Sequence, residues 1–100
     1  MNTLFIFNAS PAQSEPAYHG LRVANALARN GEPVRIFLFA DGARLANPAG
    51  GKFDVTELMV SLTENNVVIG ACGACLDARD ITELAPPVVR GTLGDVTNWT

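Results

Sequence analysis

The chain alternates short, continuously apolar runs with longer segments in which apolar residues recur every three or four positions. The apolar runs are TLFIF at residues 3–7, VRIFLFA at 34–40 and VVIGA at 67–71. Runs of this length, rich in β-branched and aromatic residues, are typical of strands buried on both faces of a parallel sheet. VVR at residues 88–90 follows Pro86-Pro87 and is a shorter candidate for a fourth strand.

Helical periodicity fills the intervals between these runs. The first helix is expected between Ser14, a favoured N-cap residue, and the stop signal Asn30-Gly31. A second is expected from Asp54, which forms a capping-box signature with Glu57. The apolar positions that define helical faces are Ala17, Leu21, Ala24 and Ala28, then Val55, Leu58, Met59 and Leu62, and finally Leu93, Val96 and Trp99. Residues 43–53, which contain Pro-Ala-Gly-Gly, are expected to form a loop.

This order of strands and helices predicts an α/β fold. Short connections between strand, helix and strand favour right-handed βαβ units and therefore a parallel sheet. Ligands of such sheets bind at the carboxyl ends of the strands. Three loops are expected to meet there, and their candidate binding residues are Asn8, Ser10, Asp41 and Gly73. Asp41-Gly42 is also ordinary turn chemistry, and Ser10 has no His or acidic partner at a spacing that would indicate a hydrolase.

Composition limits the possible functions further. The 100 residues suffice for one domain, and 48% of them are hydrophobic, which supports a packed core. A net charge of −3 and a pI of about 4.9 disfavour non-specific binding to nucleic acid and electrostatic binding to an anionic membrane. No segment is long enough to cross a bilayer, and the apolar start lacks the basic region of a signal peptide. We therefore expect a cytoplasmic protein, in which thiols stay reduced.

The sharpest chemical signal is CGAC at residues 72–75, where the third strand gives way to a helix. Free N–H groups and the positive dipole at a helix start favour an anion and lower the pKa of a thiol below its usual value of about 8.5. Gly73 leaves room for a partner to approach the sulfur, and Arg79 supplies a nearby cation. Cys72 is therefore the candidate nucleophile, while Cys75 is a second thiol that either resolves a disulfide or packs under the helix.

Other interpretations of the two cysteines remain open. Cys72 can be a small buried residue without chemistry, since free cysteine is often buried. The pattern C-x-x-C is also that of redox dithiols, although here it follows the third strand rather than the first. A structural zinc ion needs about four ligands, and the chain offers only two cysteines and His19. We expect no metal and no cofactor.

The sequence CGACLDARDI at residues 72–81, with the later Gly91-Thr92-Leu93 and Trp99-Thr100, resembles the DsrE/DsrF-like family of small sulfur-relay proteins, in particular its YchN-like branch. The likeness covers nearly the whole chain, as one domain over residues 1–100. It implies a three-layer, flavodoxin-like or Rossmann-like parallel-sheet fold. It also implies a homotrimer or homohexamer with the site near a subunit boundary.

By this resemblance, Cys72 accepts sulfur from a donor protein as a persulfide and passes it to an acceptor protein, with Cys75 and Arg79 as further site residues. Two features depart from the family pattern. Asp80 stands where relatives tend to have glycine, which adopts a left-handed backbone more readily. Relatives also tend to continue through a helix and a final strand, so we expect either that the sheet lacks this edge strand or that a neighbouring chain covers the edge.

Three functions are therefore weighed. The first is a sulfur carrier, sulfurtransferase-like in its chemistry, that acts through Cys72. The second is a non-catalytic module of the same fold that binds a small molecule or serves in an assembly. The third is a redox switch in which Cys72 and Cys75 form a reversible disulfide.

Overall fold

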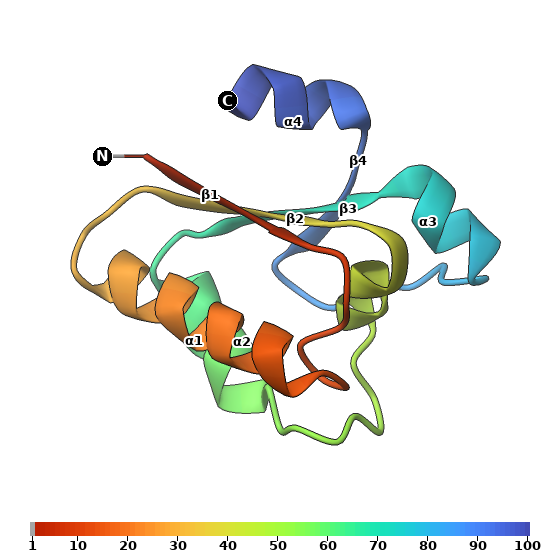
Figure 1. The fold of residues 1–100 in the computed structure, drawn as a ribbon, viewed down its shortest axis with the longest axis horizontal. Helices are drawn as coiled ribbons and strands as arrows, with labels where there is room; N and C mark the ends of the chain where they lie inside the picture. Colours follow the sequence, from red (N-terminus) through yellow and green to blue (C-terminus); the bar gives the residue numbers. More distant parts are fainter. Residues whose placement is uncertain (1) are drawn as a thin grey trace.

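The computed structural model describes residues 2–100, and its centre is a sheet of four parallel strands (Figure 1). The strands stand side by side in the order in which they occur along the chain. Their bounds are β1 Thr3–Phe7, β2 Val34–Leu38, β3 Val68–Cys72 and β4 Val88–Gly91. The predicted α/β fold with a parallel sheet is confirmed, and the short run after the two prolines is its fourth strand.

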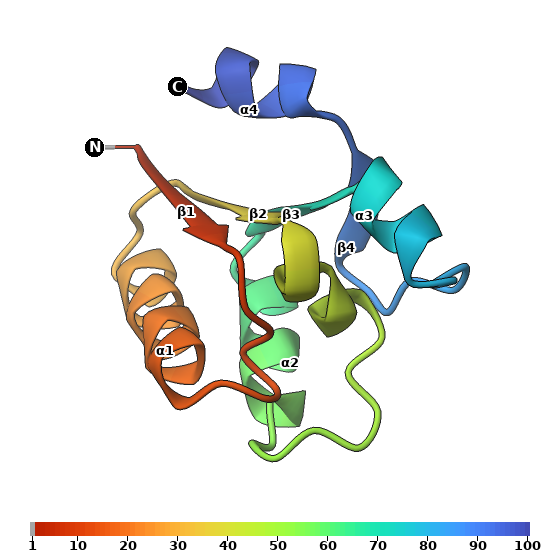
Figure 2. The same ribbon diagram turned by 45° about the vertical axis from the view of Figure 1, so that its right-hand side comes forward.

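The helices are divided unequally between the two faces of the sheet. Helices α1 (Glu15–Arg29) and α2 (Thr56–Glu64) lie on one face, and α4 (Leu93–Trp99) lies on the other (Figures 1 and 2). Two right-handed connections that step in the same direction along a sheet place both of their helices on the same face. The third layer of the fold is therefore α4 alone. None of the helices within residues 2–100 has the length and apolar character needed to span a membrane.

Local sequence signals account for the ends of the helices. The Ser14 side chain accepts a hydrogen bond of 3.4 Å from the Ala17 N–H at the start of α1, and Gly31 follows the helix with a φ of 85°. Helix α2 begins at Thr56, and Asp54 accepts a hydrogen bond of 2.9 Å from its N–H. The predicted capping box with Glu57 is absent there, because the N-cap is Val55 and makes no side-chain bond. A complete capping box is present instead at α4, between Thr92 and Asp95.

The first part of the predicted loop at residues 43–53 is a buried 3₁₀ helix, η1 (Ala40–Ala46). Small residues explain this, because they allow the backbone to pack directly beneath the strand ends. A Cβ atom on Gly42 would clash with the carbonyl oxygen of Phe7, so only glycine fits at that position. The later part of the loop is held by a hydrogen bond of 2.9 Å from the Phe53 N–H to the Ala12 carbonyl.

The two faces of the sheet differ in how well they are covered. Ile36, Leu38 and Ile69 face α1 and α2 and are fully buried. On the opposite face, Trp99 of α4 packs edge-on against Phe37 with ring centroids 6.3 Å apart. The side chains of this face that α4 does not cover are exposed to solvent: Ile6 is 56% exposed and Val89 is 55% exposed. We call this second face, with Ile6, Val68, Val89 and Leu93 as its exposed apolar residues, the open face.

Candidate functional site

The parallel strands bring the predicted loops to one edge of the sheet. The Phe39 N–H donates a hydrogen bond of 2.9 Å to the Phe7 carbonyl, which joins the ends of β1 and β2. Helix η1 follows β2 and contacts β3 and helix α3 (Gly73–Ala78), which starts immediately after Cys72. The loops at the carboxyl ends of the strands, which the sequence analysis grouped, are therefore neighbours in space.

Cys72 is the last residue of β3 and the N-cap residue of α3. Its side chain is buried, and 6% of the residue remains exposed. Its side chain makes no capping hydrogen bond to the helix. The predicted junction of strand and helix is thus present, with the sulfur at the carboxyl end of an inner strand.

The groups around Cys72 favour its anionic form. Burial by itself raises the pKa of the thiol, but neighbouring donors outweigh that effect. The backbone N–H and the thiol of Cys75 both stabilise the Cys72 thiolate, and the N–H of Ala74 and the charge of Arg90 add to them. The pKa of Cys72 is consequently lower than the ordinary value for cysteine. Because the thiolate is the nucleophile, a lowered pKa increases the reactive fraction near neutral pH.

Cys75 has the opposite tendency. Burial raises the pKa of its thiol, and the hydrogen bond that it donates to Cys72 raises it further. Its Sγ atom accepts a hydrogen bond of 3.2 Å from the Ala40 N–H, which links α3 to the start of η1. Both cysteines are free thiols. The two thiols are therefore shifted in opposite directions: the pKa of Cys72 is lowered and that of Cys75 is raised.

The bond from Ala40 to Cys75 depends on a left-handed backbone, because Ala40 has a φ of 51°. An alanine in that region costs roughly 1 kcal/mol more than a glycine. We expect Ala40→Gly to raise the free energy of unfolding by about 0.5 kcal/mol, after allowance for the greater freedom of glycine in the unfolded chain. Chemical denaturation of the two proteins measures this difference.

The matched control is Ala43→Gly in the same 3₁₀ helix. Ala43 is fully buried and is not among the residues with positive φ. Its replacement removes a buried methyl group and adds backbone freedom, and should lower the free energy of unfolding by about 1 kcal/mol or more. Equal losses in both variants would contradict the strain assigned to Ala40.

Arg79 lies beside Cys75 and Asp41. Its Nε and Nη2 atoms donate to Asp41 Oδ1 at 3.0 and 2.8 Å, and its Nη1 donates to the Cys75 carbonyl at 3.2 Å. The hydrogen bonds and charge of Arg79 hold the pKa of Asp41 below its usual range. The arginine whose charge acts on Cys72 is Arg90 of β4, which the sequence analysis did not single out. Its one visible signal was a charged residue near the end of a short apolar strand.

The other predicted site residues, Gly73, Asn8 and Ser10, differ in their burial and in their local contacts. Gly73 is buried at the first position of α3, next to Cys72. Asn8 is exposed in the loop after β1. Ser10 is buried, and its hydroxyl accepts a hydrogen bond of 3.3 Å from the Ala12 N–H, so it stabilises a turn.

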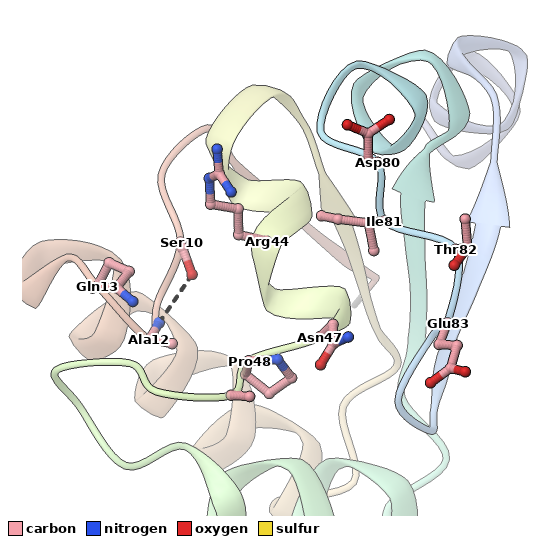
Figure 3. Close-up of a pocket in the computed structure, with 11 residues that line it drawn as sticks. Ser10, Ala12, Gln13, Arg44, Asn47, Pro48, Asp80, Ile81, Thr82 and Glu83 are labelled. Carbon is pink, nitrogen blue, oxygen red and sulfur yellow. Dashed lines mark hydrogen bonds between the residues drawn. The ribbon is translucent and has the colours of Figure 1, made fainter.

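A polar cavity of about 340 Å³ lies between the loop after β1, helix η1 and the segment after α3 (Figure 3). Ser10 and Gln13 border it on one side, Arg44 comes from η1, and residues 80–83 form the other side. Arg44 Nε is 3.6 Å from Asp41 Oδ1, so the cavity adjoins the Asp41–Arg79 pair. Within residues 2–100, the side chains of His, Cys, Asp and Glu form no cluster of three that could hold a metal ion.

Comparison with known proteins identifies the group to which this arrangement belongs. The sequence matches the DsrE/DsrF-like family over residues 1–100. The chain is a member of the DsrE/DsrF-like family. The resemblance indicated by the segment around Cys72 is thereby confirmed.

Several known proteins match most of the chain. Protein YchN of Escherichia coli strain K12 is 31% identical over 105 residues, which cover 97% of this chain and 89% of YchN. An uncharacterized protein of Methanopyrus kandleri is 32% identical over 99 residues, covering 94% of this chain and 82% of that protein. The crystal structure of YchN from E. coli has a TM-score of 0.86 and 28% identity to this chain, and the match covers 99% of this chain and 92% of YchN.

Asp80 illustrates how this DsrE/DsrF-like chain differs from the family pattern noted above. The residue follows the end of α3 and has a φ of 55°, in the left-handed region that favours glycine. Aspartate adopts this region at a lower cost than most residues because its short polar side chain bonds locally. Aspartate is thus accommodated at this left-handed position, and its residue lines the edge of the cavity.

Proposed function

We propose that this protein is a small sulfur-relay protein in which Cys72 accepts sulfur as a persulfide and passes it on. The observation that carries the proposal is the set of donors around Cys72, which favours a thiolate at the carboxyl end of β3. Membership in the DsrE/DsrF-like family supports it. Cys75 has a raised pKa and so fits the role of hydrogen-bond donor better than that of nucleophile.

The proposed chemistry is an exchange between a thiolate and a persulfide. The Cys72 thiolate attacks the outer sulfur of a donor persulfide, R–S–SH. The new bond joins the Cys72 sulfur to that outer sulfur, the donor S–S bond breaks, and the donor leaves as the thiolate R–S⁻. An acceptor thiolate then attacks the outer sulfur on Cys72, takes it with its proton, and restores the Cys72 thiolate. No oxidant or reductant is consumed in either step.

The limited exposure of Cys72 constrains its partners. Only 6% of the residue is exposed, so a partner must reach a largely buried side chain. We infer that donor and acceptor are proteins that each present a cysteine on a projecting segment. A direct test incubates the protein anaerobically with a cysteine desulfurase and cysteine, then locates added sulfur by peptide mass spectrometry. The proposal expects the added sulfur on Cys72, and a protein that remains unmodified would contradict it.

The second candidate is a dithiol switch, and the hydrogen bond from the Cys75 thiol to Cys72 favours it. The two functions differ in what they require of Cys75. A switch loses its function when either cysteine is replaced, whereas a relay through Cys72 continues with serine at position 75, because a hydroxyl can also donate a hydrogen bond.

We further propose that the protein works as a homo-oligomer, a trimer or hexamer, that covers the open face. A small domain gains stability by burying apolar surface in this way, and Ile6 and Val89 are each more than half exposed. We propose a cytoplasmic location because both cysteines are free thiols, the state that a reducing compartment maintains.

A further inference from the structure

The guanidinium group of Arg90 occupies the space that a side chain at position 73 would fill. A Cβ atom on Gly73 would lie 2.8 Å from Nη2 of Arg90 and 2.9 Å from both Cζ and Nε. Real Cβ atoms do not approach other atoms so closely, so the arginine can take this position only because residue 73 is glycine. The guanidinium therefore lies directly over the first residue of α3, beside Cys72.

Asp77 fixes the guanidinium in that position. Arg90 Nη1 and Nη2 donate to the two carboxylate oxygens of Asp77, each at 2.9 Å. Asp77 lies one helical turn after Gly73, so the two residues share a face of α3. A bidentate pair of this kind restricts direction as well as distance. Helix α3 thus supplies both the space for the guanidinium and its anchor.

The pairing of β3 with β4 brings Arg90 to this place. Arg90 is opposite Ala71 and Gly91 is opposite Cys72 in the parallel register. The side chain of Arg90 therefore starts beside the end of β3 and needs only to cross the beginning of α3 to reach Asp77.

We propose that Arg90 stabilises the sulfur anion of Cys72, as thiolate and as persulfide, and that Gly73 and Asp77 are positioning residues that hold its guanidinium over the site. This inference rests on the proposed sulfur-relay function. The sequence analysis named Arg79 as the cation near Cys72, and we assign that role to Arg90.

The remaining charges near Cys72 support this assignment. The charge of Arg90 adds to the donors of Cys75 and Ala74 in lowering the pKa of Cys72. Asp77 is the main cause of the raised pKa of Arg90, and the Cys72 anion adds to it. Arg79, which follows α3, is paired with Asp41 of η1, which largely offsets its charge. On α4, Asp95 is the carboxylate nearest to Gly91, and it accepts a hydrogen bond of 2.8 Å from the Thr92 N–H.

The test is the pH dependence of Cys72 alkylation by iodoacetamide, resolved from Cys75 by peptide mass spectrometry. In Arg90→Gln, we expect the pKa of Cys72 to rise toward its ordinary value, by a modest amount because an exposed arginine acts through partly screened charge. Arg90→Lys, which keeps the charge but loses the planar fork, should recover part of the difference. Arg79→Gln is the matched control, a second arginine paired with an aspartate at the same sheet edge, and should leave the pKa of Cys72 unchanged.

Gly73→Ala tests the positioning role, since alanine suits a helix but displaces the guanidinium. It should raise the pKa of Cys72 in the wild-type background and change it little in an Arg90→Ala background. Higher ionic strength should raise the pKa of Cys72 in the unmodified protein, a measurement that needs no variant. A Cys72 pKa unchanged in Arg90→Gln and insensitive to salt would overturn the inference, even if Cys72 accepts sulfur. If instead Arg90→Gln raises the pKa but Cys72 takes no sulfur, the relay proposal fails while Arg90 keeps its role toward the thiolate.

Discussion

Replacing Cys72 with serine is expected to reduce the rate of sulfur acceptance by roughly a thousandfold or more, on the scale seen when a catalytic nucleophile is removed. Serine has nearly the same size, so the junction between β3 and α3 should persist. What is lost is the thiolate, which the surrounding donors stabilise and a serine hydroxyl cannot form near neutral pH. The rate is measured as incorporation of sulfur from a cysteine desulfurase loaded with cysteine.

Cys75→Ser is the matched control for this prediction. Serine at position 75 retains a donor toward Cys72, and we expect sulfur acceptance within about tenfold of the wild-type rate because one hydrogen bond contributes about 1 kcal/mol. Equal loss in both variants would favour the dithiol switch. Normal function of the Cys72→Ser protein would leave only a binding or assembly module.

Placing a charge on the open face is expected to dissociate the proposed assembly into single chains. Val89 lies at the centre of β4 and is 55% exposed. Val89→Glu would bury a carboxylate in the contact between subunits, which is strongly unfavourable without a partner for the charge. Molar mass by light scattering after size-exclusion chromatography measures the change, and circular dichroism verifies that the fold is retained.

Val23→Glu is the control for the assembly prediction. Val23 belongs to α1, on the opposite side of the molecule from the open face, and is 54% exposed. The same charge at nearly the same exposure should leave the molar mass of the oligomer unchanged. Assembly through the open face would be refuted if the wild-type protein remained a single chain at high concentration. It would also be refuted if the Val89→Glu variant kept the molar mass of the oligomer.

The sequence pattern was most informative where local spacing determines structure. The apolar runs predicted all four strands, and the position of Cys72 between an inner strand and a helix followed from the residues around it. Helix η1 was missed because its burial depends on a distant contact, the approach of Gly42 to the Phe7 carbonyl. No periodicity within residues 43–53 carries that information.

The cation beside Cys72 shows the same limit. Arg79 is close to Cys72 in sequence, but it follows α3 and therefore reaches Cys75 and Asp41. Arg90 is eighteen positions away and reaches the site through the pairing of β3 with β4. Spacing along the chain identifies residues on one helix or strand, whereas an arginine delivered by a neighbouring strand becomes visible only in the assembled sheet.

The central claim is that its neighbours lower the pKa of Cys72 below the ordinary value for cysteine, whereas burial and the Cys72 thiol raise the pKa of Cys75. The most direct test is alkylation of the unmodified protein across a range of pH, with the two cysteines followed separately by peptide mass spectrometry. The account predicts that the reaction of Cys72 has its midpoint below that of free cysteine measured in the same buffer, and that of Cys75 above it. A Cys72 midpoint at or above that of free cysteine would contradict the account.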